Sequence, residues 1–377
     1  MTKAYFDNSA TTKLCDKAKE AIISACDAYG NPSSLHSLGT VSGEMLENAR
    51  KTIADSIKAL PEEIYFTSGG TESDNMAIVG AVKALRRRGN KIVTTAIEHS
   101  AIINTMKQLE ADGFEVVYLK PDESGTVPIS AFLDAIDEKT ILVSVMSVNN
   151  ETGCFLPIDK IKKVIVRKNS PALFHCDATQ SFMKYDINLK KCGIDLLTIS
   201  AHKIHGPKGV GALYIKKGVR ILPRTFGGEQ EKGLRPGTEP LILINGFSAA
   251  VKDFGVSTEN AKKCAEIKQY IKEKLENYED IIINSPENSS DYILNISVIG
   301  IRSETLLHFL EQREVFVSSG SACAKGKPSH VLSALGFSPK RIDSAIRISF
   351  SKFNDISQAD RLIDGIISAR DTLIKSK

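Results

Sequence analysis

The sequence predicts an α/β fold, with a mostly parallel seven-stranded sheet in a large domain and a smaller α+β domain toward the C-terminus. Seven short apolar runs lie between residues 64 and 215 and alternate with longer helix-like segments. This alternation is typical of βαβ units. Several runs are apolar along their whole length, as expected for strands that helices cover on both faces.

The expected strands are rich in β-branched and aromatic residues, which favour extended structure. They occupy residues 64–67, 91–96, 115–119, 141–148, 172–176, 195–200 and 211–215. From about residue 258 the pattern changes to a long charged helix-like stretch, then YILNISVIG, the helix-like ETLLHFLEQ, and FVSSGSACAKGKP. We therefore expect a domain boundary near residue 255.

Length and composition fit a globular chain with a sizeable core. The 377 residues exceed the usual size of one domain, and 42% are hydrophobic and 25% charged. No apolar run approaches the ~20 residues of a membrane span. The start, MTKAYFDNSATT, lacks the basic and apolar segments of a signal peptide. We expect a cytoplasmic protein without a membrane partner.

Charge and cysteine content argue against two other classes. The net charge of +4 is spread along the chain, and a solvated helix end explains the densest basic run, Arg86–Arg88. We therefore expect no direct nucleic-acid binding. The seven cysteines are odd in number and form no CxxC pair, so we expect neither a disulfide framework nor a metal site.

Polar clusters follow five of the predicted strands. They are SGGTES (68–73), EHS (98–100), NNETG (149–153), DATQS (177–181) and SAHK (200–203). Ligands of open α/β sheets bind beyond the carboxyl ends of the strands. One such cluster is ordinary loop chemistry, but five together predict a single site.

Three of these clusters fit one cofactor. Ser68–Thr71 lies where a strand passes into a helix, whose free N–H groups favour a phosphate, although a plain glycine turn is the alternative. Asp177 follows a buried strand and needs a cation such as a ring nitrogen, although it could cap the next helix instead. Burial would lower the pKa of Lys203 and suit it to a Schiff base. Together these features describe pyridoxal 5′-phosphate (PLP).

Longer motifs match a known family almost end to end. They are YFDNSATT (5–12), YGNPSSLHSLG (29–39), FTSGGTESDN (66–75), VNNETG (148–153), DATQS, SAHKIHGPKGVGALY (200–214), LRPGTE (234–239) and SSGSACA (318–324). By these motifs the chain resembles the cysteine desulfurases of the NifS and IscS kind, in the class V aminotransferase group of fold-type I PLP enzymes. The resemblance implies a large PLP-binding domain at 14–255, and a small domain at 1–13 and 256–377 with the catalytic cysteine loop.

The resemblance also implies a homodimer and a role for each site residue. Lys203 carries PLP as a Schiff base, Asp177 holds the pyridine nitrogen, Gln180 contacts the ring hydroxyl, and His99 stacks on the ring and serves catalysis. The phosphate is held by Gly70, Thr71, Ser200 and His202, and by Thr238 of the neighbouring subunit. Asn149 lies against the ring or substrate, and Asn31 and Arg347 bind the substrate carboxylate.

Cys323 is the expected acceptor of the sulfur. Its neighbours in SSGSACAKGKPSH predict an exposed loop, in which Lys325 and Lys327 favour the thiolate. The implied reaction has Lys203 move a proton and Cys323 attack the sulfur of L-cysteine, which yields L-alanine and a persulfide on Cys323. The persulfide then passes to an acceptor protein, for which an iron–sulfur scaffold, a tRNA-thiolation relay and another thiol acceptor remain open.

Other hypotheses use part of the same site. A selenocysteine lyase or a class V aminotransferase would use Lys203 and Asp177, and neither would need Cys323 for transamination. A non-catalytic scaffold in a sulfur-transfer complex belongs to a different class. A scaffold has no chemical reason to keep Lys203, Asp177 and Cys323 together, so we favour the desulfurase.

Overall fold

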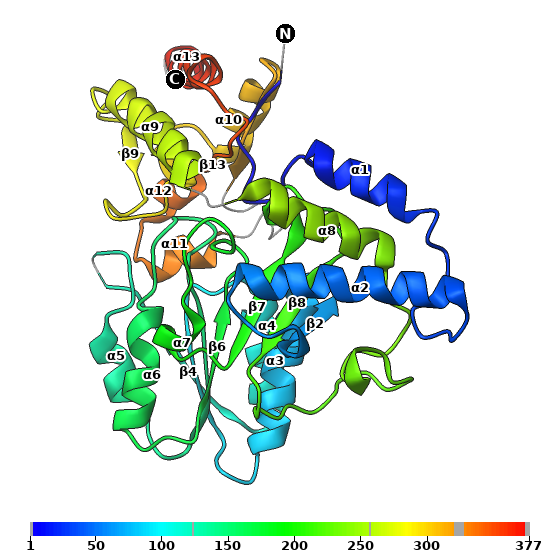
Figure 1. Cartoon of the computed structure of the whole chain (residues 1–377). Helices are drawn as coiled ribbons and strands as arrows, with labels where there is room; N and C mark the ends of the chain where they lie inside the picture. The colour runs from blue at the N-terminus through cyan, green and yellow to red at the C-terminus, as the bar shows by residue number, and fades with distance from the viewer. Residues whose placement is uncertain (1–2, 123, 256–257, 320–327, 374–377) are drawn as a thin grey trace.

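The structure is a computed structural model that describes residues 3–122, 124–255, 258–319 and 328–373. A seven-stranded sheet lies beside a four-stranded sheet and a two-stranded sheet. Helices cover the large sheet on both faces, and the C-terminal helices lie around the small sheets at one end (Figure 1).

The large sheet has the strand order β2-β8-β7-β6-β5-β3-β4. Its strands are β2 (Ile64–Thr67), β3 (Lys91–Thr95), β4 (Glu115–Leu119), β5 (Thr140–Met146), β6 (Leu173–Asp177), β7 (Leu196–Ser200) and β8 (Gly211–Ile215). Every expected strand is present, and the prediction of a mostly parallel seven-stranded sheet is confirmed. Several interior strands are buried along their whole length, which explains their unbroken apolar runs.

β8 is antiparallel to both of its neighbours, β7 and β2. The connection from β7 to β8 spans only residues 201–210, with a short 3₁₀ turn at Ala201–Lys203. A parallel crossover needs a dozen or more residues, so the chain turns back instead. β2 consequently runs in the same direction as β7, and its carboxyl end lies at the same edge.

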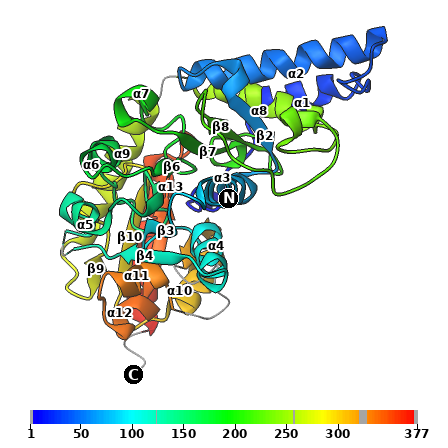
Figure 2. The same cartoon turned by 90° about the horizontal axis from the view of Figure 1, so that it is seen from below.

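Two groups of helices cover the two faces of the large sheet. α3 (Gly70–Leu85) and α4 (Ser100–Ala111) pack on one face. The other face is covered by α2 (Ser37–Ser56), α5 (Ile129–Ala135), α6 (Ile158–Arg167), α7 (Leu189–Cys192) and α8 (Leu241–Phe254). α1 (Asp16–Ala25), α2 and α8 pack together and project from the body of the molecule (Figure 2).

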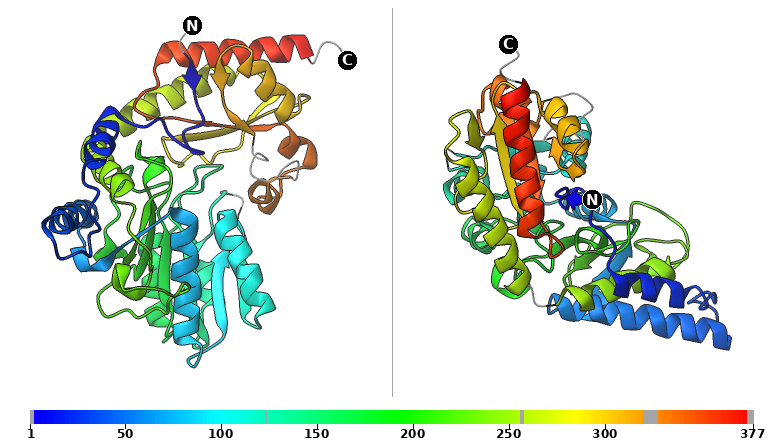
Figure 3. Two further views of the ribbon diagram at one scale, coloured as in Figure 1. Left: turned by 90° about the vertical axis from the view of Figure 1, so that its right-hand side faces the viewer. Right: turned by 90° about the horizontal axis from the view of Figure 1, so that it is seen from above.

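The C-terminal part has its own core, to which the N-terminal residues also contribute. It holds α9 (Thr258–Leu275), β9 (Ile281–Ile283), β10 (Ile293–Val298), α10 (Ser303–Glu311), β11 (Val315–Phe316), β12 (Ser318–Ser319), α11 (His330–Ala334), α12 (Pro339–Asp343), β13 (Ala345–Ser349) and α13 (Ile356–Leu373). β1 (Ala4–Tyr5) pairs in parallel with β11, and Phe6 is buried in this second core. Figure 3 shows β1 beside α13. The exact domain boundaries stay a prediction.

Among the helices of the described residues, none has the combination of length and apolarity that a membrane crossing requires. In the same residues, no group of three or more His, Cys, Asp or Glu side chains is arranged to hold a metal ion.

Candidate active site

A pocket of about 460 Å³ lies at the edge where the carboxyl ends of the parallel strands meet. Nine of the residues predicted from the sequence line it: Gly70, Thr71, His99, Asp177, Gln180, Ser200, His202, Lys203 and Arg347. They come from the ends of β2, β3, β6 and β7 and from β13. The structure therefore brings the separate sequence clusters into one site.

Lys203 lies in the 3₁₀ turn that follows β7. Its ammonium donates to the backbone carbonyls of Ser9 and Ala10, at 2.5 and 2.9 Å. Burial lowers the pKa of Lys203 to about 7, and the positive charges of Arg347 and Lys184 act in the same direction. A large share of the amine is consequently neutral near pH 7 and can act as a nucleophile.

Two carboxyl groups face the pocket from different elements. Asp177 ends β6, and its Oδ1 accepts a hydrogen bond from the Thr179 N–H at 2.8 Å. Asp74 projects from α3 and is 1% exposed. Burial, and then the neighbouring Asp177, raise the pKa of Asp74 well above its usual range. Asp74 therefore favours its protonated form.

His99 caps the N-terminus of α4, where its Nδ1 accepts from the Ala101 N–H at 3.2 Å. Burial lowers the pKa of His99, so the neutral ring carries its proton on Nε2. Burial also lowers the pKa of His202 to about 3, and its Nδ1 lies 3.3 Å from Thr11 Oγ1. Both imidazoles thus enter the pocket uncharged.

The N-terminus of α3 opens toward this pocket. Its N-cap residue, Gly69, has φ +146°, which a glycine adopts readily, and no side chain caps the helix. The first N–H groups of α3 are therefore available to an anion. A Cβ atom at Gly70 would lie 3.0 Å from Thr179 Oγ1, so the absence of a side chain keeps this end of the pocket open.

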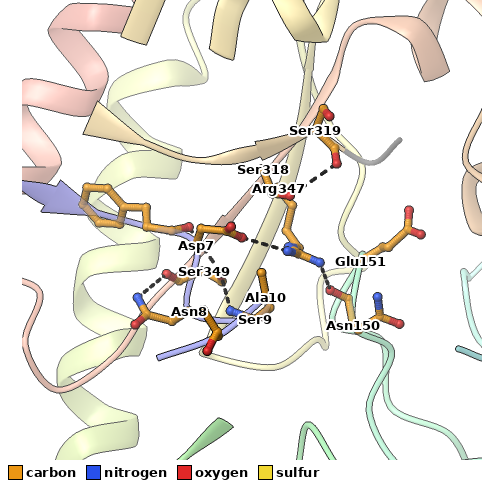
Figure 4. A network of polar contacts seen from close by, with 12 residues as sticks. Asp7, Asn8, Ser9, Ala10, Asn150, Glu151, Ser318, Ser319, Arg347 and Ser349 are labelled. Carbon is orange, nitrogen blue, oxygen red and sulfur yellow. Dashed lines mark hydrogen bonds and ion pairs between the residues drawn. The ribbon is translucent and has the colours of Figure 1, made fainter. Parts of the chain in front are cut away.

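Arg347 reaches the pocket from β13, and Figure 4 shows it between Asp7 and Asn150. Its Nη2 donates to Asp7 Oδ1 at 2.8 Å, and its Nη1 donates to the Asn150 carbonyl at 3.1 Å. Among the described residues, no partner meets its buried Nε. The guanidinium is thus fixed in place, and its buried Nε–H is still unused.

Buried polar atoms without a hydrogen-bond partner concentrate at this pocket. In the part of the chain that the structure describes, they include Ser9 Oγ, Asp74 Oδ1, Asn150 Oδ1, Thr179 Oγ1, Ser200 Oγ and Arg347 Nε, and all six residues line it. Buried polar groups are nearly always paired in folded proteins, so such a concentration indicates a polar ligand.

Four of the predicted residues are elsewhere or undescribed. Within the described ranges, the lining of the pocket does not include Asn149, Asn31 or Thr238. Asn149 is fully buried, where its amide donates to the Ile97 carbonyl and accepts from two backbone N–H groups. Asn31 and Thr238 are exposed. Cys323, with Lys325 and Lys327, lies outside the described residues.

Sequence reasoning assigned no role to several lining residues: Asp7, Ser9, Ala10, Asp74, Asn150, Thr179 and Ser318. Each belongs to a motif that the resemblance had singled out, such as YFDNSATT or VNNETG. The motifs themselves were thus the available signal. What they did not reveal is which side chain of each motif faces the pocket.

Comparison with known proteins identifies the family. The model of the family "Aminotransferase class-V" matches residues 4–362. The chain belongs to this family. It is 41% identical over 367 residues to a putative cysteine desulfurase IscS 1 from Bacillus subtilis, covering 95% of this chain and 96% of that protein.

Two solved structures resemble this chain closely. A NifS-like protein superposes with a TM-score of 0.93 and 36% identity, covering 99% of this chain and all of the other. A structure titled SspA in complex with cysteine superposes with a TM-score of 0.82 and 36% identity, covering 94% and 100%. The predicted kinship with the NifS and IscS cysteine desulfurases is confirmed.

Proposed function

We propose that this chain is a PLP-dependent cysteine desulfurase. It takes sulfur from L-cysteine, releases L-alanine, and leaves the sulfur as a persulfide on Cys323 for transfer to an acceptor protein. The observation that carries this proposal is the group of unpaired buried polar atoms in the same pocket as Lys203, whose pKa is lowered to about 7. Family membership and the names of the relatives support the same activity.

The residues of the pocket fit PLP. Lys203 would bind its aldehyde carbon, Asp177 its ring nitrogen and Gln180 its ring hydroxyl, while His99 would stack on the ring. The N-terminus of α3, with Thr71, Ser200 and His202, would hold the phosphate, because the unpaired Ser200 Oγ and the uncapped helix offer donors there. When bound, PLP supplies an electron sink for bond breaking in the substrate.

Arg347 would bind the carboxylate of L-cysteine through its unused Nε, since Asp7 and Asn150 already hold its other nitrogens. Lys203, whose lowered pKa leaves a large share of the amine neutral near pH 7, would take and return a substrate proton. The Cys323 thiolate would form a bond to the substrate sulfur as the bond from that sulfur to Cβ breaks. The electron pair of that bond goes to the substrate carbon, which gains a proton and leaves as L-alanine.

A homodimer is also proposed, with Thr238 reaching the phosphate in the neighbouring subunit. Large exposed apolar side chains support it, because several of them lie on α1, α2 and α8, which project from the body of the molecule (Figure 2), and on the loops beside these helices. They are Ile23, Tyr29, Leu35, Leu38, Val41, Phe226 and Ile242. Exposed apolar surface of this kind is typical of protein interfaces.

The segment that precedes Thr238 is firmly anchored. Glu231 accepts from both Nη atoms of Arg50 at 2.8 Å and from the Phe66 N–H at 2.9 Å. Such a bidentate buried pair fixes the direction of the backbone that leads to Thr238.

We also propose that Asn31 acts on the substrate carboxylate. The chain would divide into two domains at residue 255, and the protein would be cytoplasmic.

The test incubates the purified protein with L-cysteine and a thiol reductant and quantifies alanine and sulfide. We expect equal amounts from wild type, loss of turnover and of the visible PLP band in Lys203→Ala, and loss of sulfide with the band retained in Cys323→Ala. Cys26→Ala is the matched control, because Cys26 is the exposed cysteine among the described residues. Full activity in Cys323→Ala would overturn the persulfide mechanism.

The same assay separates the other hypotheses. A selenocysteine lyase would release selenide from selenocysteine and little sulfide from cysteine. An aminotransferase would convert a 2-oxo acid to an amino acid with Cys323→Ala as active as wild type. A non-catalytic scaffold would form neither product with any of these substrates.

A further inference from the structure

A second buried lysine lies behind the pocket. Lys184 follows β6 and is 5% exposed. Its ammonium lies 5.3 Å from the centroid of the Tyr292 ring and 3.5 Å from Gln180 Oε1, a long charge–dipole contact. Lys184 does not itself line the described pocket, and neither the sequence motifs nor the proposed reaction gives it a role.

Lys184 and Ser9 together determine how the Gln180 amide is oriented. Gln180 Nε2 donates to the Ser9 carbonyl at 3.0 Å, and Oε1 faces Lys184. The reversed amide would set its NH₂ group against the ammonium and its oxygen against the carbonyl, and both contacts would be repulsive. The positive charge of Lys184 therefore fixes which end of Gln180 points to which neighbour.

The same network leads to Lys203. The Ser9 carbonyl that accepts from Gln180 also accepts from Lys203 Nζ at 2.5 Å. Lys184 is thus joined to the reactive amine through one amide and one carbonyl. The charge of Lys184 lowers the pKa of Lys203, in the same direction as burial and Arg347.

Several charged groups act on the pKa values of the two lysines. For Lys203, Arg347 and Lys184 favour the neutral amine, whereas Asp7 and Asp177 favour the charged one. His99 and His202 also face Lys203, and burial lowers the pKa of both. Burial lowers the pKa of Lys184 itself to about 8, with Cys264 and Arg347 as its charged or titratable neighbours, so Lys184 is largely protonated at pH 7.

We infer that Lys184 is a positioning residue for Lys203: its buried ammonium holds the Gln180 amide in one orientation and places a positive charge behind the reactive amine. The inference rests on the proposed function, because Lys203 and Gln180 are the groups that would meet the aldehyde and the ring hydroxyl of PLP. Removal of this charge should make the nitrogen of Lys203 easier to protonate.

The experiment titrates the visible absorption of the PLP-loaded protein with pH, in the absence of L-cysteine. The midpoint reports protonation of the nitrogen that Lys203 shares with the cofactor. In Lys184→Met we expect this midpoint to rise by about one pH unit, as for loss of one charge at an effective dielectric constant near 20. Lys184→Arg, which keeps the charge, should titrate close to wild type.

Lys268 provides the matched control. It is also a buried lysine, 8% exposed, with burial lowering its pKa to about 8. Its Nζ donates to Ser289 Oγ and to the Ser290 carbonyl, both at 2.9 Å, and it does not line the described pocket. Lys268→Met should leave the midpoint unchanged, and thermal melting of each variant reports whether it is folded.

The outcomes separate this inference from the proposed function. If Lys184→Met leaves the titration midpoint unchanged, or if Lys268→Met shifts it equally, the inference is overturned but the proposed function is not. If Lys184→Met does not fold, Lys184→Gln supplies the comparison, because it removes the charge and keeps a polar group. A wild-type protein that forms no visible band with PLP would overturn the proposed function, and this inference with it.

Discussion

The Arg347 guanidinium donates to the Asp7 carboxylate at 2.8 Å although 340 residues separate them in the chain. The contact joins β13 to the segment that follows β1, and both side chains line the pocket. Because Arg347 also donates to the Asn150 carbonyl, its plane is fixed before any ligand arrives. Preorganisation of this kind lowers the ordering cost of binding a carboxylate.

Arg347→Lys should weaken the binding of L-cysteine. Lysine keeps the positive charge but lacks the planar fork, so it cannot hold Asp7, Asn150 and a substrate carboxylate together. We expect the KM for L-cysteine to rise about 10- to 100-fold, the loss of one charge-assisted hydrogen bond. The visible band of bound PLP should stay as in wild type. A KM within threefold of wild type would contradict the assignment.

Asp74→Asn should stabilise the protein at alkaline pH. The raised pKa of Asp74 means that the folded state keeps a proton that the unfolded chain loses above about pH 4. Stability therefore falls as pH rises from this value, and asparagine removes the effect. We expect the variant to melt about 2 °C or more above wild type at pH 8, with the gap closing at pH 5. An equal difference at both pH values would refute a protonated Asp74.

The reactivity of Lys203 should depend on pH with a midpoint near its lowered pKa of about 7. Below this pH the rate of combination with added PLP should fall about tenfold per unit, and above it the rate should level off. The same shift makes stability rise with pH between about 7 and the unfolded value near 10.4, since the folded state binds fewer protons there. Stopped-flow absorbance, with Lys203→Ala as the blank, measures the rate. A rate that still climbs tenfold between pH 8 and 9 would exclude a lowered pKa.

Subunit mixing tests whether Thr238 serves the neighbouring site. We expect light scattering to give twice the chain mass, and Thr238→Ala to retain PLP about tenfold less tightly, the effect of one lost hydrogen bond. When Thr238→Ala and Lys203→Ala subunits are mixed and re-associated, one site of each mixed dimer again has Lys203 from one subunit and Thr238 from the other. Its activity should clearly exceed the sum of the two parents, whereas a monomer, or a site completed within one chain, would give only the sum.

The strands of the large sheet could be predicted because each is a short apolar run bounded by polar turns. The antiparallel direction of β8 was not predicted, although residues 201–210 are too few for a helical crossover. The small sheets were harder to predict, since β11 and β12 have two residues each and carry no periodic signal. Their pairing with β1 and β13 depends on contacts across the whole chain.

The location of a site residue could be predicted where a titratable residue closely follows a strand, as for Asp177 and Lys203. It could not be predicted at Asn149 and Asn150, because adjacent residues in a turn point to different sides and either asparagine satisfies the motif. Nor could the roles of the Ser9 and Ala10 carbonyls be foreseen, since any residue supplies a backbone acceptor. Such backbone contacts depend on the path of the folded chain, which the identity of the residues does not reveal.

The residues after β1 have a consequence for biosynthesis. Asn8 donates to the Ser349 carbonyl across 341 positions, and Phe6 packs in the C-terminal core. A ribosome therefore makes Asn8 341 positions before Ser349, and synthesis adds about 5–20 residues per second. Residues 4–10 must therefore wait many seconds before they can dock, while the large sheet is already complete. The reactive lysine gains its Ser9 and Ala10 acceptors only at that final step, so a nascent or truncated chain holds an incomplete pocket.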